Sequence, residues 1–152
     1  MLPPEIITAL IAMTPVAEVR VSVPFAIHAL GLSPVAAYFF SVAGNIVPAF
    51  SIVAIGTVVN WLSRRIYGFN RFFTWLFERT RRKHRHRVAN MHELALLVVV
   101  AVPIPLTGVW TASLVAFLFG ISFLRALPYL AAGSAIASFI MLLISLGAIR
   151  LF

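Results

Sequence analysis

The sequence predicts an all-α integral membrane protein in which two re-entrant helical hairpins alternate with two long transmembrane helices. The first observation is composition, because the 152 residues are 62% hydrophobic and only 11% charged, with a mean hydropathy of +1.03. Soluble globular domains do not reach this balance. The second observation is that two apolar stretches are long enough to cross a bilayer, whereas two others are broken by prolines. The length indicates one membrane domain, residues 1–152.

The first apolar stretch, residues 5–30, is broken by Pro15 and Pro24. Proline removes a backbone donor and clashes with the preceding helical turn, so we expect half-helices over 5–14 and 22–30. At about 1.5 Å per residue, each reaches only about half of a ~30 Å hydrocarbon core. The stretch therefore predicts a re-entrant hairpin, and a kinked span is the alternative.

The second stretch, residues 34–60, contains no charged residue and is long enough to span with some tilt. Residues 126–149, between Arg125 and Arg150, have the same character. These two stretches predict the long transmembrane helices.

The remaining apolar stretch, residues 92–119, repeats the broken design. MHELALLVVVAV is followed by the break PIPLTG and then by VWTASLVAFLF. Because Pro103, Pro105 and Gly108 interrupt the helix, we expect a second re-entrant hairpin here.

The two halves of the chain resemble each other at an offset of 89 residues. GLSPVAAYFFSVAG (31–44) and GISFLRALPYLAAG (120–133) are identical at five of fourteen positions, and each half has the order broken segment, Gly-x-Ser turn, full span. This order predicts an internal repeat, with repeat 1 over about 5–60, a connector over about 61–91 and repeat 2 over about 92–150.

The topology depends on how often each repeat crosses the membrane. A hairpin plus one span crosses once, which makes the repeats inverted and puts both termini outside. Two crossings per repeat would make them parallel, with cytoplasmic termini. We favour the inverted arrangement, because irregular backbone at membrane depth needs the shelter that paired hairpins provide.

The connector, residues 61–91, carries most of the positive charge. Nine of the twelve Lys and Arg residues lie between Arg64 and Arg87, which places this loop on the cytoplasmic side and favours contact with anionic lipid headgroups over nucleic acid. Apolar residues recur at helical spacing and predict an amphipathic interfacial helix anchored by two tryptophans. The apolar positions are Leu62, Ile66, Phe69, Phe73 and Leu76, and the tryptophans are Trp61 and Trp75.

Glu18 and Arg20 are the leading candidates for a functional site. Ionisable residues inside a membrane segment are rare, are paired as a rule, and indicate function by default. Glu18 could carry a proton, and Arg20 could bind an anionic group such as a phosphate. The alternative is a structural ion pair that satisfies a broken helix.

The second break offers backbone and hydroxyl groups that could coordinate an ion or a polar headgroup, or could merely turn the chain. Asn45 could reach a broken segment or hold two helices together, and His28 could exchange protons with Glu18 or be a buried histidine. The remaining candidates lie in the two breaks: Pro24, Pro105, Thr107, Gly108, Trp110 and Thr111.

Enzyme and metal chemistry find little support in the sequence. The chain has no cysteine and no aspartate, and it lacks a P-loop, a nucleophile elbow and a zinc helix motif. His84 and His86 stand among cations, which disfavours a metal site. We therefore predict no enzyme activity, no cofactor and no metal.

The motifs at the two breaks resemble a known family. EVRVSVPFAI (Glu18 to Ile27), the Gly44-Asn45 pair and PIPLTGVWT (Pro103 to Thr111) are similar to the small multi-drug export proteins of prokaryotic membranes. That family is similar to the DedA-type membrane proteins, which are thought to carry paired re-entrant loops in inverted repeats. Val21 and Leu106 stand where the family pattern has glycines.

The resemblance implies a multi-pass protein of the prokaryotic inner membrane that exports small compounds. The DedA-type relatives imply lipid-phosphate translocation driven by the proton gradient, with a proton on Glu18 and a phosphate on Arg20. We expect a proton-linked secondary transporter of small amphipathic compounds, as a homo-oligomer. A lipid-phosphate flippase or scramblase, and a membrane assembly or structural protein that transports nothing, are the alternatives.

Overall fold

The described part of the computed structural model is helical and contains no strand. The structure describes the chain except for residues 1, 66–67, 69–70, 73, 76–77, 79–88, 104–107 and 152. The elements are α1 (Pro4–Met13), α2 (Glu18–His28), α3 (Pro34–Ile46), the 3-10 turn η1 (Val47–Phe50), α4 (Ser51–Arg65), α6 (Ala89–Ala101), α7 (Val109–Leu118) and α8 (Phe123–Leu151). The all-helical prediction is thus confirmed.

The first broken segment forms two short helices, α1 and α2, joined by a turn. Pro15 disfavours helical backbone at the residue before it, and Thr14 is extended, with φ −75° and ψ 142°. The predicted start of the second half-helix at residue 22 is wrong, because α2 begins at Glu18 and Pro24 lies inside it. A proline within a helix leaves the carbonyl four residues earlier without its donor, which here is the carbonyl of Arg20.

The first long apolar stretch is one continuous helical rod made of α3, η1 and α4. Ser33 caps its start by accepting a hydrogen bond from the Ala36 N–H at 3.2 Å. Pro48 produces the short 3-10 turn, in which the Val47 N–H donates to the Gly44 carbonyl. The apolar part, Pro34–Val59, is 26 residues long and can cross a membrane by length and composition.

The second half of the chain repeats this order. Helices α6 and α7 flank the second break, and α8 contains a 25-residue apolar stretch, Phe123–Gly147. The helix begins before the predicted residue 126, since the Ser122 carbonyl accepts hydrogen bonds from the Arg125 and Ala126 N–H groups at 3.0 and 2.9 Å. Two apolar helices of membrane-spanning length, as predicted, are therefore present.

Helix boundaries recur at the 89-residue offset. Helices α3 and α8 begin at Pro34 and Phe123, and the turns before them contain Gly31 and Gly120, with φ values of +67° and +70°. Backbone in this left-handed region favours glycine. The same backbone turn therefore precedes both long helices.

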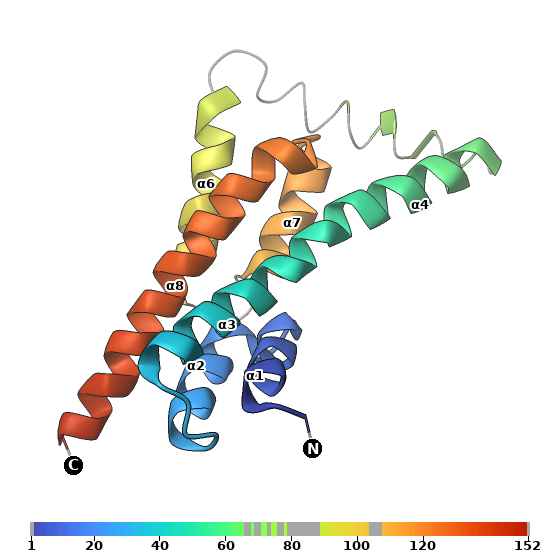
Figure 1. Cartoon of the computed structure of the whole chain (residues 1–152). Coiled ribbons are helices and arrows are strands. Elements are labelled where there is room, and N and C mark those ends of the chain that lie inside the picture. Colours follow the sequence, from blue (N-terminus) through green and yellow to red (C-terminus); the bar gives the residue numbers. More distant parts are fainter. Residues whose placement is uncertain are drawn as a thin grey trace.

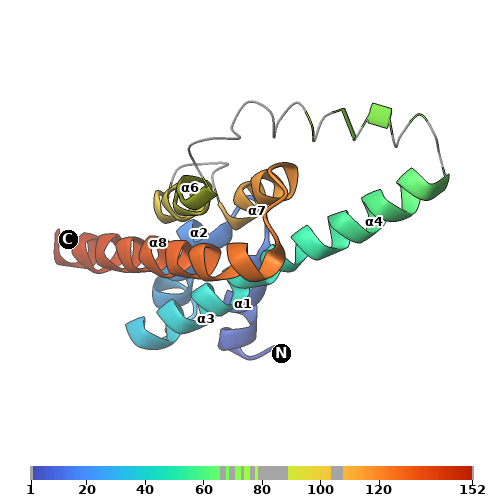
Figure 2. The ribbon, with the colours of Figure 1, turned by 90° about the horizontal axis from the view of Figure 1, so that it is seen from above.

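The two short-helix pairs lie at opposite ends of the molecule. Figure 1 shows α1 and α2 at one end, with α2 beside the C-terminal half of α8, and α6 and α7 beside the first half of α8, while α3 and α8 run in opposite directions. Seen from above, α6 and α7 lie on one side of α8, and α1 and α3 lie on the other (Figure 2). The two breaks consequently face each other in the middle of the molecule.

Glycines allow each pair to pack tightly on its own long helix. A Cβ at Gly44 would collide with the backbone of Ala9 in α1, and a Cβ at Gly133 would collide with the Leu97 carbonyl and Val100 in α6. Gly44 and Gly133 are themselves 89 positions apart. Small residues at these crossings permit close backbone approach, as is common between transmembrane helices.

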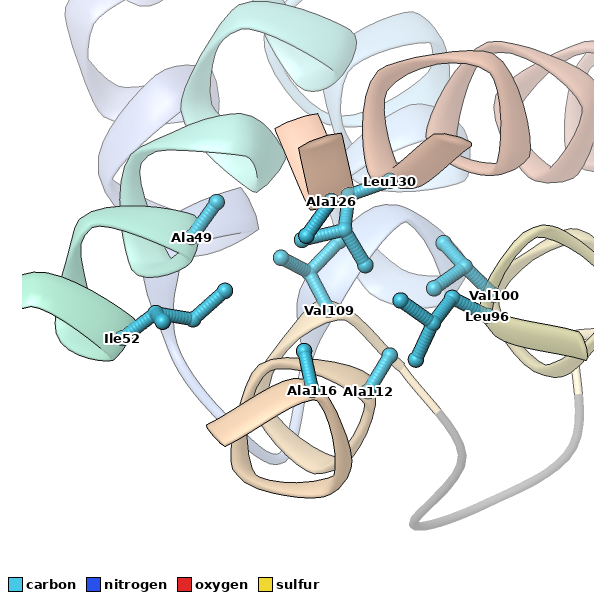
Figure 3. Packing of buried hydrophobic residues seen from close by; sticks show 9 residues of the cluster. All are labelled: Ala49, Ile52, Leu96, Val100, Val109, Ala112, Ala116, Ala126 and Leu130. Atoms are coloured by element: carbon cyan, nitrogen blue, oxygen red, sulfur yellow. The ribbon is translucent and has the colours of Figure 1, made fainter. Parts of the chain in front are cut away.

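The interior is a small apolar core, and the exterior is apolar as well. Leu96, Val109 and Leu130 meet at the junction of α6, α7 and α8, with Ala49 and Ile52 approaching from η1 and α4 (Figure 3). Large side chains such as Phe39 (63%) and Leu124 (80%) remain exposed. An apolar surface of this extent suits lipid rather than water.

The predicted amphipathic connector lies largely outside the described residues. Its first residues continue α4, and the exposed Trp61 ring lies 5.4 Å from the guanidinium carbon of Arg65. Phe72 and Trp75 are also exposed, with ring centroids 6.3 Å apart. Aromatic and basic side chains of this kind suit a membrane interface.

Candidate functional site

Glu18 lies at the turn between α1 and α2, and its side chain points inward. Only 3% of the residue is exposed. Its backbone has φ +46°, the one positive φ at a non-glycine among the described residues. Such backbone is uncommon outside glycine, and it concentrates at sites where the surrounding structure fixes a side chain for function.

Arg20 is the ion-pair partner of Glu18. The Arg20 Nη2 donates to the Glu18 Oε2 at 2.9 Å, and the side chains are 15% and 4% exposed. Burial strengthens such an attraction but removes both charges from water. Each partner therefore compensates the charge of the other, and removal of either partner alone would leave a buried charge.

Gly108 forms the wall against which the Glu18 carboxylate lies. A Cβ at Gly108 would overlap both carboxylate oxygens. The Gly108 backbone is extended, with φ −125°, a conformation that any residue can adopt. Glycine is required here by space, and the two motifs from distant parts of the sequence meet at this point.

Trp110 makes a second link between the two breaks. Its indole N–H donates to the carbonyl oxygen of Met13 at 2.9 Å. Met13 is the last residue of α1, and carbonyls at a helix end lack an intrahelical donor. The second break thus supplies a hydrogen bond that the first helix cannot make itself.

Asn45 lies where the two long helices cross. Its Nδ2 donates to the Ser134 Oγ at 3.0 Å, and these two positions are 89 residues apart. Nearby, the Ser22 hydroxyl of α2 donates to the Ser41 Oγ of α3 at 2.8 Å. All four side chains are buried, so a polar cluster joins α2, α3 and α8.

The other candidates occupy different positions in the structure. Pro24 is half-buried within α2, and Thr111 is exposed in the first turn of α7. His28 is exposed at the far end of α2, ten positions and about 15 Å from Glu18. A direct proton exchange between His28 and Glu18 is therefore not part of this arrangement. Pro105 and Thr107 lie outside the described residues.

The sequence reasoning overlooked several residues of the centre. Ser22 follows Glu18 by one helical turn, a spacing that places both on one face and could have drawn attention to it. Ser134 could have been found by adding the repeat offset to Asn45. The Met13 carbonyl could not have been found in this way, because every residue has a backbone carbonyl and the residue type does not indicate which one accepts a hydrogen bond.

The arrangement offers a buried carboxylate and a guanidinium paired with it. Among the described residues there is no cluster of His, Cys, Asp or Glu that could hold a metal ion. A carboxyl group is of the chemical type that exchanges protons, and a guanidinium is of the type that binds anions.

A family model described as "Putative small multi-drug export protein" matches residues 18–140 of the chain. The match begins at Glu18 and includes the second break and most of α8. No curated protein and no solved structure is significantly similar to the chain.

Proposed function

The chain belongs to the small multi-drug export family, and from this premise we propose that it is a proton-linked secondary transporter that exports small amphipathic compounds across a prokaryotic cell membrane. The observation that carries the proposal is the buried Glu18–Arg20 pair at the junction of the two breaks. Ionisable residues at membrane depth are costly, and they recur in proton relays and substrate pathways.

The proposed architecture is an inverted repeat with two re-entrant hairpins. Helices α1 and α7 have ten residues each, about 15 Å, which is half of the hydrocarbon core. The opposite directions of α3 and α8 and the 89-residue recurrence of helix starts support it (Figure 1). The Asn45–Ser134 hydrogen bond joins equivalent positions of the two halves, as expected where a pseudo-two-fold axis passes.

The proposed topology places the basic connector, residues 61–91, in the cytoplasm and both ends of the chain outside. The positive-inside rule supports a cytoplasmic connector. Both ends of the chain lie outside if each repeat crosses the membrane once. Nine positive charges between Arg64 and Arg87 would hold the connector against anionic lipid headgroups.

The proposed mechanism couples the charge on Glu18 to the contact between the hairpins. Ionised, the carboxylate accepts the hydrogen bond of Arg20 and lies against Gly108. Protonation weakens the ion pair, because the attraction between unit charges is lost. Arg20 is then free to pair with another anionic group, and the hairpins can separate to admit a substrate.

A lipid-phosphate flippase is the second candidate, favoured by two partly exposed side chains, one from each break. The Arg20 side chain is 15% exposed, and Trp110, which bonds to the end of α1, is 39% exposed. A guanidinium binds phosphate through several donors, and an indole suits the boundary between headgroup and hydrocarbon. A phospholipid carries both a phosphate for Arg20 and a boundary between headgroup and hydrocarbon for Trp110.

Flux measurements on proteoliposomes test the proposal. With an imposed pH gradient, Glu18→Gln should abolish uptake of amphipathic dyes, since glutamine keeps the hydrogen bond to Arg20 but cannot ionise. Glu5→Gln, the same change at the start of α1, is the matched control and should transport normally. Unchanged flux in Glu18→Gln would exclude the proton-carrier role.

Two further readouts separate the alternatives. A flippase would move a fluorescent phosphatidic acid between leaflets and lose this activity in Arg20→Gln. An assembly protein would tolerate both substitutions and co-purify with a stable membrane partner. The homo-oligomeric state that we propose would appear as a mass above that of one 16.7 kDa chain.

A further inference from the structure

Buried polar side chains lead away from Glu18 through the interior. Ser22 lies four residues after Glu18 on α2, and both residues are buried. Its hydroxyl donates to Ser41 at 2.8 Å, and Asn45 follows Ser41 by one turn on α3. Ser22, Ser41 and Asn45 are at most 1% exposed, so a strip of buried polar side chains lies between Glu18 and the helix crossing.

The strip continues on α8. Asn45 donates to Ser134 at 3.0 Å. Ser138 and Ser145 lie four and eleven residues further along, which keeps them on the same helical face as Ser134. They are 0% and 4% exposed.

Several polar atoms of the strip have no partner in the described structure. These are the Asn45 Oδ1, the Ser138 Oγ and the Ser145 Oγ. A buried polar atom without a hydrogen bond costs about 1–3 kcal/mol, and ordered water commonly satisfies such atoms in protein interiors. Each of these three atoms is therefore able to form a hydrogen bond with water.

The strip leads toward the end of the molecule at which α8 ends. Ala137 packs with Val19 and Val23 of α2, and Met141 packs against the same cluster. Figure 1 shows α2 and the C-terminal part of α8 running toward the same end of the molecule. Ser145 is nearer to that end than Ser138, and in the proposed topology this is the outer end.

Among the residues that the structure describes, Arg20 is the charged group that faces Glu18, as its ion-pair partner. The strip residues of α3 and α8 carry no charge, and α7 presents Gly108 to the carboxylate. The α1 end nearest to the site contributes the Met13 carbonyl, which Trp110 already occupies.

We propose that Ser22, Ser41, Asn45, Ser134, Ser138 and Ser145 line a hydrated proton pathway that connects Glu18 with the outer end of the molecule. The proposal rests on the proposed function, in which Glu18 takes up the proton. Each step passes one proton along a hydrogen bond between water molecules and hydroxyls, with Asn45 holding a water in place. The last step protonates the Glu18 carboxylate, and Arg20 keeps its charge.

Silver ions test the hydration directly, because the chain has no cysteine. Ser138→Cys and Ser145→Cys are nearly isosteric variants, and Ser113→Cys is the matched control. Ser113 is also fully buried with an unpartnered hydroxyl, but it lies on α7 outside the strip. Proteoliposomes are first exposed to Ag⁺, a soft cation of about the size of a water molecule that binds thiolates. The protein is then denatured, and the thiols that did not bind Ag⁺ are labelled with maleimide.

We expect Ag⁺ to block maleimide labelling of Ser138→Cys and Ser145→Cys at least about tenfold faster than labelling of Ser113→Cys. The reason is that only hydrated thiols ionise and bind Ag⁺ readily. Equal rates at Ser138→Cys and Ser113→Cys would overturn the pathway. Elution of each variant as wild type on gel filtration establishes that it is folded. If Ser138→Cys does not fold, Ser145→Cys gives the same decision.

The uptake of amphipathic dyes into the same vesicles, driven by a pH gradient, tests the function of the strip. Asn45→Leu, which removes the amide at similar size, should slow pH-driven uptake about tenfold, while Ser113→Ala should not. Normal uptake in Asn45→Leu combined with lost uptake in Glu18→Gln would overturn the pathway and leave the transport proposal standing. Normal uptake in Glu18→Gln would overturn both.

Discussion

Replacement of Gly108 by alanine tests whether the two breaks meet as the structure shows. The new Cβ would overlap the Glu18 carboxylate, and overpacking of this kind costs about 1–3 kcal/mol. Gly108 is also the N-cap of α7, where alanine is worse than glycine by about 0.5 kcal/mol. Together these effects should lower the melting temperature by about 5–10 °C for a chain of this size.

The cap effect and the clash can be separated by a change of background. In Glu18→Ala/Arg20→Met, the carboxylate is absent and no charge is left unpaired, so Gly108→Ala should cost only the cap effect. The coupling energy should therefore be about 1–3 kcal/mol. Thermal unfolding in detergent, followed by tryptophan fluorescence, measures it.

The control for the glycine itself is Gly147→Ala. Gly147 lies inside α8, and nothing lies within 4 Å of an added Cβ. This variant should be more stable by about 0.5–1 kcal/mol through helix propensity alone. If Gly108→Ala has the same effect in both backgrounds, within about 0.5 kcal/mol, Glu18 and Gly108 do not touch and the description of the site is wrong.

Two further predictions concern the contact between the hairpins and the topology. Trp110→Phe removes the N–H that binds the Met13 carbonyl, and should destabilise the protein by about 0.5–1.5 kcal/mol in chemical or thermal unfolding; a neutral effect would contradict a link through this bond. Epitope tags at both ends of the chain should be accessible in intact spheroplasts, whereas a tag in the connector, residues 61–91, should require permeabilisation. Protected terminal tags would favour the parallel arrangement instead.

The long helices were the most predictable part of the fold. Composition alone identified the apolar stretches, and the flanking Ser33-Pro34 pair marks a helix start. Pro24 was misleading, because the prediction treated it as a helix breaker. Its neighbours in the packed helices compensate for the lost backbone bond, which a sequence taken alone does not reveal.

The site was predictable in its residue types but not in its contacts. The rarity of charge in the membrane segments identified Glu18 and Arg20. Their partner Gly108 was singled out as part of a motif, yet the reason for glycine there is an approach between two distant segments. Such an approach depends on how α7 and α2 are placed by α8, a property of the whole fold.

The two halves share a helix arrangement but differ in the side chains that they contribute to the site. At the 89-residue offset, Glu18 corresponds to Thr107, Arg20 to Val109 and Trp110 to Val21. The charged pair therefore comes only from the first half, and the glycine wall and indole donor come only from the second. Two identical sites would each need their own proton. In the mechanism that we propose, a single carboxylate in contact with the opposite hairpin would let one protonation event act on both halves at once, as alternation between two inverted repeats requires.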